Sequence, residues 1–254
     1  MINIIDGSNM LHRAMYNPEG KFGVHPLREL YLRFMLADPH TIIVWDGMHS
    51  LKRRRDLFPG YKQRPDKGED IKAAFDLLKE VLCHTPIMQI EVPYWEADDV
   101  LATVAKDYLA QGFTVKLESN DQDFWQLAHY ANLELPLVKP LPCEPYQTCL
   151  FKALCGDQSD KIPGWRGFGP AKWAAVQKDC LVLQGILNDE DYSVWEAYKW
   201  PKGVTPTTET FYNCCIFYKI VQLLQVPEED FTDNYIIGKS NPAQAEQIMD
   251  RWRI

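Results

Sequence analysis

Short apolar runs alternate with helix-type periodicity along the first half of this chain. Apolar runs at residues 2–6, 41–46, 86–92 and 113–119 predict β-strands, because short runs of this kind are typical of strands buried on both faces. Between them, apolar residues at helical spacing predict helices at about 27–36, 69–83 and 96–110. Strands that alternate with helices predict an α/β fold with a mostly parallel central sheet covered by helices.

Prolines mark the point at which this pattern changes. Four of them fall between residues 135 and 145, which indicates a loop or a domain boundary. Beyond it the pattern is mainly helical, with helices predicted at about 148–154, 170–177, 190–198, 209–224 and 242–252. We therefore expect an α/β core over residues 1–135 and a helical lobe over residues 146–254 that packs on the sheet.

Carboxylates gather where the predicted strands end. The carboxyl ends of parallel strands meet at one edge of a sheet, so these side chains should lie close together and repel each other. Divalent cations relieve such repulsion, and hard oxygen ligands favour Mg²⁺ or Mn²⁺ over zinc. The pattern predicts a two-metal site for phosphoester chemistry. Its nine candidate ligands are Asp6, Asp46, Glu96, Asp98, Asp99, Asp121, Asp123, Asp157 and Asp160. A helix cap is an equal alternative for Asp99.

Positive charge is concentrated in one segment of this acidic protein. The formal net charge of the 254 residues is −8, which alone would argue against a nucleic-acid partner. Between residues 52 and 67, however, seven cations stand against only two carboxylates; the cations are Lys52, Arg53, Arg54, Arg55, Lys62, Arg64 and Lys67. The local distribution therefore keeps a nucleic-acid partner open.

The composition favours a reducing, aqueous compartment. No apolar stretch reaches the roughly 18 residues that a bilayer span requires, and the N-terminal segment does not have the form of a signal peptide. The seven cysteines are an odd number without a CxxC pair, which is typical of reduced thiols in a cytosolic protein. We therefore expect a cytoplasmic protein without a membrane partner.

The segment from Gly156 to Gly169, GDQSDKIPGWRGFG, is the most specific motif. Its glycines would let backbone N–H groups approach a phosphate closely, at the start of a helix that Pro170 opens. It is not a P-loop, because Pro170 occupies the position of the P-loop lysine. A plain glycine-rich turn is the alternative, but it would leave the carboxylates just ahead of it unexplained.

These motifs together resemble the 5′-nuclease superfamily, which comprises flap endonucleases, phage 5′-exonucleases and the 5′-nuclease domain of bacterial DNA polymerase I. The glycine-rich segment is similar to the helix–three-turn–helix of that family, and residues 54–64 are similar to its basic arch segment. The carboxylate motifs at 6–9, 45–47, 96–99 and 119–123 follow in the same order. Two residues depart from the usual pattern without removing a ligand: Gln122 stands for a lysine and Lys161 for an asparagine.

The resemblance implies a PIN-like 5′-nuclease fold with a basic arch at about 50–68 and a helix–three-turn–helix at about 156–178. It also implies two Mg²⁺ ions, for which Mn²⁺ can substitute, and a K⁺ ion held by carbonyls in the helix–three-turn–helix. One divalent ion would be held by Asp6, Asp46, Glu96 and Asp98, and the second by Asp121, Asp123, Asp157 and Asp160. The implied reaction is in-line attack of a metal-bound water on a phosphodiester.

The resemblance also assigns roles to the basic segments. Lys62 and Arg54 are the candidates for catalytic cations at the scissile phosphate, beside Asp46 and Asp121 as catalytic metal ligands. The alternative is a solvated basic loop that only attracts DNA. Tyr61 would either stack on an unpaired base or lie in the core of the arch. The residues expected to contact DNA are Arg53, Arg55, Tyr61, Arg64, Arg166, Gly167, Gly169 and Lys172.

The function expected from these observations is that of a monomeric, structure-specific 5′-nuclease. It would act on DNA with 5′ ends, flaps or junctions between single strand and duplex, in the cytoplasm of a bacterium or of a phage-infected host. Two alternatives are a PIN-type ribonuclease, which generally lacks a segment like 156–169, and a nuclease-dead DNA-binding module, which would lack one or more of the acidic residues.

Overall fold

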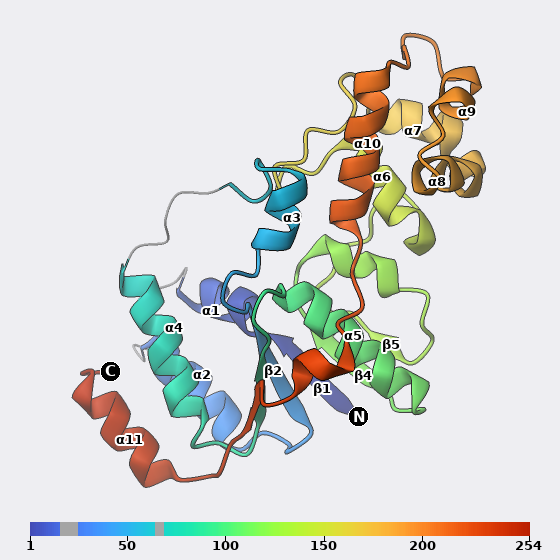
Figure 1. The fold of residues 1–254 in the computed structure, drawn as a ribbon. Helices are drawn as coiled ribbons and strands as arrows, with labels where there is room; N and C mark the ends of the chain where they lie inside the picture. Colours follow the sequence, from blue (N-terminus) through green and yellow to red (C-terminus); the bar gives the residue numbers. More distant parts are fainter. Residues whose placement is uncertain (16–24, 64–68) are drawn as a thin grey trace.

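A six-stranded sheet forms the centre of the computed structural model, which describes residues 1–15, 25–63 and 69–254 (Figure 1). Its strands lie in the order β5-β4-β1-β2-β3-β6, and all neighbours are parallel except β3 and β6. The bounds are β1 (Ile2–Asp6), β2 (Thr41–Trp45), β3 (Met88–Glu91), β4 (Val115–Glu118), β5 (Leu133–Glu134) and β6 (Tyr235–Ile237). The predicted mostly parallel sheet is confirmed.

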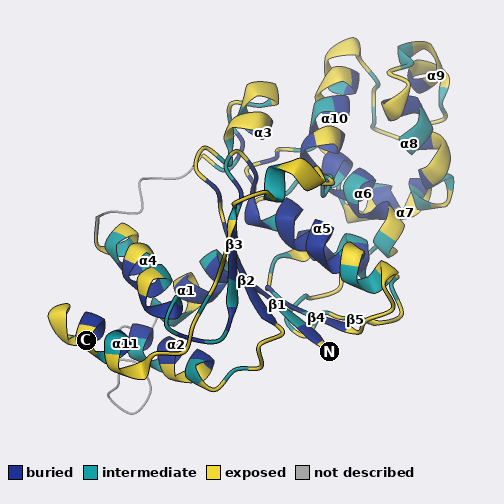
Figure 2. Cartoon of the chain, turned by 60° about the horizontal axis from the view of Figure 1, so that its bottom comes forward, coloured by how far each residue is buried: buried dark blue, intermediate teal, exposed yellow. Residues whose placement is uncertain are grey.

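Alternate residues of the central strands face opposite layers of helices. Ile4 pairs with Ile42 in register and packs toward α5 (Ala97–Ala110), whereas Ile5 and Ile43 pack toward the other face. That face is covered by α1 (Gly7–Met15), α2 (Pro26–Met35), α4 (Glu69–Leu82) and α11 (Pro242–Arg251). Because both faces are covered, the central strands are almost continuously apolar and buried (Figure 2).

A second group of helices packs around its own aromatic core to one side of the sheet (Figure 1). It is built from α6 (Thr148–Cys155), α7 (Pro170–Val176), α8 (Cys180–Asn188), α9 (Tyr192–Ala197) and α10 (Thr208–Val221). The indole rings of Trp165 and Trp195 stack at 5.2 Å in this core. Short helix α3 (Lys52–Leu57) leads from β2 toward this lobe, where Phe58 meets Phe217 edge to face.

The chain then returns from the helical lobe to the sheet. After α10 it passes through the 3₁₀ turn Glu228–Phe231, adds β6 to the edge of β3, and ends with α11 against α2 and α4. This differs from the expectation that all of residues 146–254 form the helical lobe. The described part of the chain includes no helix that is both long and apolar enough to cross a membrane.

Candidate active site at the carboxyl edge of the sheet

A cavity of about 660 Å³ opens at the carboxyl edge of the central strands. Its walls come from the ends of β1 and β2, the start of α5, the loop after β4 and the segment around α3, so residues far apart in sequence meet there. Five of the predicted metal ligands line it, and they are Asp6, Asp46, Glu96, Asp98 and Asp121. Its other polar lining residues are Ser8, Asn9, His12, Ser50, Arg55 and Lys62.

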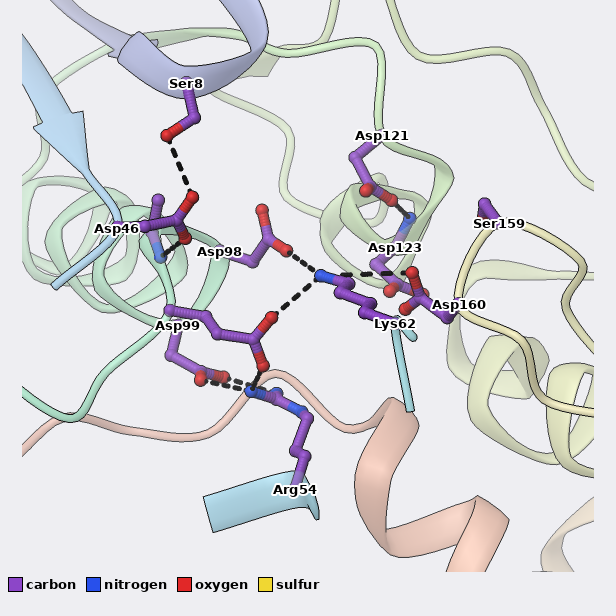
Figure 3. A network of polar contacts seen from close by, with 12 residues as sticks. Ser8, Asp46, Arg54, Lys62, Asp98, Asp99, Asp121, Asp123, Ser159 and Asp160 are labelled. Atoms are coloured by element: carbon purple, nitrogen blue, oxygen red, sulfur yellow. Dashed lines mark hydrogen bonds and ion pairs between the residues drawn. The ribbon is translucent and has the colours of Figure 1, made fainter. Parts of the chain in front are cut away.

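Neutral donors hold the two carboxylates at the ends of β1 and β2. Asp6 accepts hydrogen bonds from the backbone N–H of Asn9 at 2.8 Å and from Ser119 Oγ at 2.9 Å. Asp46 accepts hydrogen bonds from Ser8 Oγ at 2.8 Å and, at 3.0 Å, from the N–H of Ala97, the first residue of α5 (Figure 3). Both carboxylates are therefore oriented by strand ends and helix starts that the sheet fixes in place.

Crowding of carboxylates disfavours their negative charge. Burial and, to a smaller extent, the neighbouring Asp46 and Asp121 together raise the pKa of Asp6 to about 7, against the hydrogen bonds from Asn9 and Ser119. Burial also raises the pKa of Asp98 well above its usual value, although Lys62 opposes the shift. An oxygen-only donor set that is short of positive charge fits hard divalent cations.

Lys62 supplies positive charge inside the cluster. Its Nζ lies 2.8 Å from Glu96 Oε1, 3.3 Å from Asp98 Oδ2 and 3.9 Å from Asp160 Oδ1, as Figure 3 shows for the two aspartates. Burial would lower the pKa of Lys62, but these carboxylates outweigh it and hold the pKa well above its usual value. Lys62 is therefore a charged ammonium between the two predicted groups of metal ligands.

Arg54 is buried behind the cavity, and all five of its N–H donors are engaged. It forms a bidentate pair with Asp99 at 2.7 and 2.8 Å, and Nη1 also lies 2.6 Å from Glu96 Oε2. The other bonds go to the carbonyls of Ile220 at 2.7 Å and Gln222 at 2.8 Å. The structure thus brings Arg54 to the back of Glu96, and not to the open cavity where a phosphate would lie.

Asp99 shares this buried position. Besides Arg54, its Oδ1 accepts from the N–H of Leu224 at 2.8 Å, and the side chain is 1% exposed. Asp99 does not line the cavity. The two predicted roles of Asp99 were a metal ligand and a cap of α5, and its hydrogen bonds correspond to neither role. They join the start of α5 to the chain that leaves α10.

Two members of the second predicted ligand group, Asp123 and Asp157, contact a lysine that sequence reasoning missed. Lys152, on α6, is 3% exposed; its Nζ hydrogen-bonds Asp123 and lies 2.6 Å from Asp157 Oδ2. Burial raises the pKa of Asp123 to about 7 although Lys152 opposes it, whereas Lys152 lowers the pKa of Asp157 against burial. The available signal was a lone lysine in the apolar run 148–154, five residues before Asp157.

The ammonium groups of Lys62 and Lys152 lie among the predicted metal ligands. Within residues 1–15, 25–63 and 69–254, no three histidine, cysteine, aspartate or glutamate side chains converge closely enough to form a ready-made metal site. The first group, around Asp6 and Asp98, faces the cavity, while Asp123 and Asp157 face Lys152. The donor chemistry fits divalent cations, and the two lysines occupy part of the space in which positive charge is needed.

The predicted arch residues lie in three different environments. Arg55 lines the cavity and donates to the carbonyls of Tyr61 at 3.1 Å and Lys62 at 3.0 Å. Tyr61 is 2% exposed and its hydroxyl lies 3.3 Å from Glu96 Oε1, which favours the core alternative over base stacking. Arg53 is exposed and its guanidinium lies 3.9 Å from the ring centre of Trp95. Arg64 lies outside the described residues.

The glycine-rich segment forms a tight turn between α6 and α7. Gly156, Gly164 and Gly167 all have positive φ. A Cβ on Gly164 would lie 2.3 Å from the backbone N of Gly156, so a larger residue does not fit there. Arg166 and Gly167 are exposed, Gly169 precedes α7, and Lys172 Nζ donates to the carbonyl of Gly203 at 3.1 Å. Lys172 Nζ also lies beside Gly167, because a Cβ added there would be 3.8 Å from it.

Similar proteins point to one family. Residues 1–139 match the family described as 5′-3′ exonuclease, N-terminal resolvase-like domain. The chain is 27% identical over 250 residues to a 5′-3′ exonuclease of Aquifex aeolicus, with 89% of this chain and 84% of that protein covered. It is 32% identical over 206 residues to flap endonuclease Xni of Shewanella denitrificans, with 74% and 81% covered.

A solved structure of the T5 5′-exonuclease with bound divalent metal ions (zinc) has the same fold. Its TM-score is 0.59 at 22% identity, over 87% of this chain and 86% of that one. The family match spans more than half of the chain, and it includes the strand ends that carry Asp6, Asp46, Glu96 and Asp121. The resemblance expected from the motifs is thereby confirmed, and this chain belongs to the 5′-3′ exonuclease family of nucleases.

Proposed function

We propose that this protein is a structure-specific 5′-nuclease that hydrolyses phosphodiesters of DNA with the help of two divalent cations. The observation that carries the proposal is the cavity at the carboxyl edge of the sheet, which five carboxylates line and where the charged amine of Lys62 contacts Glu96 and Asp98. Family membership supports the same reaction class. Acidic residues at every predicted ligand position argue against a nuclease-dead module.

Two groups of carboxylates would hold Mg²⁺, with Mn²⁺ as a substitute. Asp6, Asp46, Glu96 and Asp98 suit the first ion because they line the cavity together. Asp121, Asp123, Asp157 and Asp160 suit the second, partly through water. Bound cations would lower the pKa of a water molecule and stabilise the charge of the leaving oxygen. Asp99 is better suited to positioning Glu96 through Arg54 than to binding a metal.

The other polar residues of the site orient these groups and neutralise charge. Ser8 and the start of α5 fix Asp46, while Asn9 and Ser119 fix Asp6. Lys62 can neutralise charge that develops on a phosphate in the cavity, because its amine lies at the cavity beside Asp98 and Glu96. Arg54 would act on Glu96 and not on the phosphate.

DNA would approach over the basic surfaces beside the cavity. Arg55 lines the cavity and Arg53 lies over Trp95 outside it, whereas Arg166, Gly167, Gly169 and Lys172 lie on the helical lobe. The exposed turn around Gly167 suits the phosphate backbone of a duplex arm, without base readout. A K⁺ ion expected from the resemblance would be held there by carbonyls. Substrates with 5′ ends, flaps or junctions suit an arrangement in which a duplex surface and a cavity are separate.

The test is metal-dependent cleavage of a 5′-labelled flap substrate, with blunt duplex and an RNA hairpin as controls. Cleavage should require Mg²⁺ or Mn²⁺ and stop with a chelator. Asp46→Asn or Asp121→Asn should lower the single-turnover rate by several orders of magnitude while DNA binding is largely kept. Asp189→Asn, an exposed carboxylate of the helical lobe, is the matched control. Near wild-type turnover of either site variant, or preferred cleavage of the RNA hairpin, would contradict the proposal.

A further inference from the structure

Two loops at the carboxyl edge of the sheet present aromatic side chains to solvent outside the cavity. One loop follows β2 and carries Met48 and His49; the other follows β3 and carries Tyr94. Met48 is 61% exposed and Tyr94 is 51% exposed. The rings of His49 and Tyr94 stack with centroids 5.6 Å apart and an interplanar angle of 28°. Together, Met48, His49 and Tyr94 form what we call the edge platform.

The backbone holds the edge platform in an unusual conformation. His49 has φ 59° and Tyr94 has φ 65°, which is the left-handed region that side chains other than glycine rarely adopt. The two loops are joined by hydrogen bonds from Tyr94 N–H to the Met48 carbonyl at 2.8 Å and from Gly47 N–H to the Trp95 carbonyl at 3.1 Å. Strained residues that keep large rings exposed are typical of functional sites.

The edge platform is close to the catalytic carboxylates. His49 follows Asp46 by three residues, and Tyr94 precedes Glu96 by two. At roughly 3.6 Å per residue, the corresponding Cα atoms lie within about 11 and 7 Å. A strand whose phosphate lies in the cavity therefore has neighbouring nucleotides within reach of the platform.

The charges around the edge platform suit a base better than a phosphate. A surface hollow of about 390 Å³ is lined by Tyr94, Trp95 and Arg53 together with the carboxylates Glu229 and Asp230. Asp230 accepts from Trp95 Nε1 at 2.8 Å. The carboxylates would repel a phosphate, whereas an uncharged base can stack on the exposed rings. Arg53, which lines the same hollow, can contact the phosphate next to that base.

We propose that the edge platform stacks an unpaired nucleobase of the substrate strand next to the scissile phosphate. Every base has a π face, so the contact would hold single-stranded DNA without regard to sequence. The platform would favour substrates with unpaired nucleotides at the cleavage position over continuous duplex. This inference rests on the proposed nuclease function and adds a binding site for the single-stranded part of its substrate.

Glycine substitutions test the edge platform without disturbing its backbone. Glycine adopts positive φ freely, so Tyr94→Gly and His49→Gly remove the rings while the loops can keep their conformation. Binding to a fluorescent 5′-flap substrate, measured by anisotropy in the presence of chelator, should weaken about 5- to 150-fold for Tyr94→Gly, the fold-change that corresponds to ~1–3 kcal/mol per stacked base. Tyr94→Phe should bind like the wild type. Tyr212→Ala, which removes an equally exposed tyrosine on α10, is the matched control and should also bind like the wild type.

A scan with single abasic nucleotides then identifies the stacked base. In the wild type, one abasic position near the junction should weaken binding, and at that position Tyr94→Gly should add less than a twofold further loss. Equal binding of Tyr94→Gly and wild type, or a loss that is the same at every abasic position, overturns the edge platform. The proposed function has a separate test, because a wild type that binds flaps but never cleaves them would refute nuclease activity alone.

Discussion

Two buried lysines determine the charge state of the carboxylate cluster. Lys62 and Lys152 each contact two or three carboxylates at less than 4 Å. The sequence was sufficient to predict that Asp6, Asp46, Glu96, Asp98 and Asp121 meet at one edge of the sheet, because each follows a strand or starts a helix in the primary structure. Only the family resemblance distinguished Lys62 from the other six cations of its segment. The sequence gave no role to Lys152, because the convergence of α6 with the loop after β4 is a tertiary contact.

Removal of Lys62 should strengthen metal binding while it weakens catalysis. Its amine competes with a divalent cation for Glu96 and Asp98, so Lys62→Ala should lower the dissociation constant for Mn²⁺, as measured by calorimetry without DNA. The single-turnover rate should fall more than DNA affinity does, because a cation that acts on developing charge lowers kcat and kcat/KM together. Lys52→Ala, which removes an exposed cation paired with Asp56, is the control and should change neither quantity. A rate unchanged at saturating metal would remove Lys62 from the catalytic residues.

The raised pKa of Asp6 predicts a pH dependence of stability in metal-free protein. The pKa rises from 3.8 to about 7 on folding, so between these values the folded chain holds a proton that the unfolded chain has lost. In chelator, the contribution of Asp6 to the free energy of unfolding should therefore decrease as pH rises from about 4 to about 7 and stay level above it. Measured by urea unfolding at several pH values, the free energy of unfolding of Asp6→Asn should decrease less steeply with pH than that of the wild type. An identical slope in both proteins would contradict the shift.

One connecting segment links the two parts of the molecule behind the cavity. The segment is residues 220–226, from the end of α10 toward the turn that precedes β6. Its carbonyls at Ile220 and Gln222 accept from Arg54, the N–H of Leu224 donates to Asp99, and the N–H of Val226 donates to Thr103 Oγ1 at 2.9 Å. The sequence analysis placed part of this segment at the end of a helix. Nothing local marks it, because its partners lie more than 100 residues earlier.

Loss of Arg54 should therefore be costly for folding. Removal of one partner of a buried ion pair leaves an uncompensated charge, so Arg54→Leu should lower the free energy of unfolding by roughly 3–5 kcal/mol. Because Arg54 and Asp99 share their bonds, Arg54→Leu combined with Asp99→Leu should destabilise less than the sum of the two single variants. The exposed pair of Lys219 and Glu190 is the control, and Lys219→Ala should cost less than about 1 kcal/mol. Full additivity in urea unfolding would exclude the coupling.

Lys172 gives a test of the turn between α6 and α7. Its amine bonds to Gly203 and lies beside exposed Gly167, so it can meet a backbone phosphate of a duplex. Lys172→Ala should weaken duplex-bearing substrates about equally across sequences and flatten the salt slope of log K by roughly one unit. Short single strands should be nearly unaffected. Lys239→Ala, an exposed lysine near the end of β6, is the control; a loss that depends on base sequence would contradict the assignment.

At the scale of the whole molecule, the last residues belong to the α/β part. The four long strands could be predicted because each is a local apolar run, but β5 and β6 have only two and three residues and no period of their own. The buried side chains of α11 could be recognised as a helical face, yet the partner of that face could not. Ala245, Ile248 and Met249 pack into the same core as α1, α2 and α4.

Truncation of one side chain on α11 should show that the stability of the α/β part depends on this helix. Ile248 is 1% exposed, so Ile248→Ala should lower the free energy of unfolding by about 2–5 kcal/mol. Gln247→Ala, at the neighbouring exposed position, should change stability by less than about 0.5 kcal/mol. Equal values for the two variants in urea unfolding would show that α11 does not stabilise the sheet.

The return of the chain to the sheet has a consequence for biosynthesis. Because β6 pairs with β3 and α11 covers α2 and α4, the sheet is complete only after the whole helical lobe has been translated. Until then the edge of β3 and the apolar sides of α2 and α4 stay uncovered on the ribosome. Contacts of such long sequence separation form slowly. The helical lobe can fold earlier around its own tryptophans, so the nascent protein would form the turn between α6 and α7 before its sheet is complete.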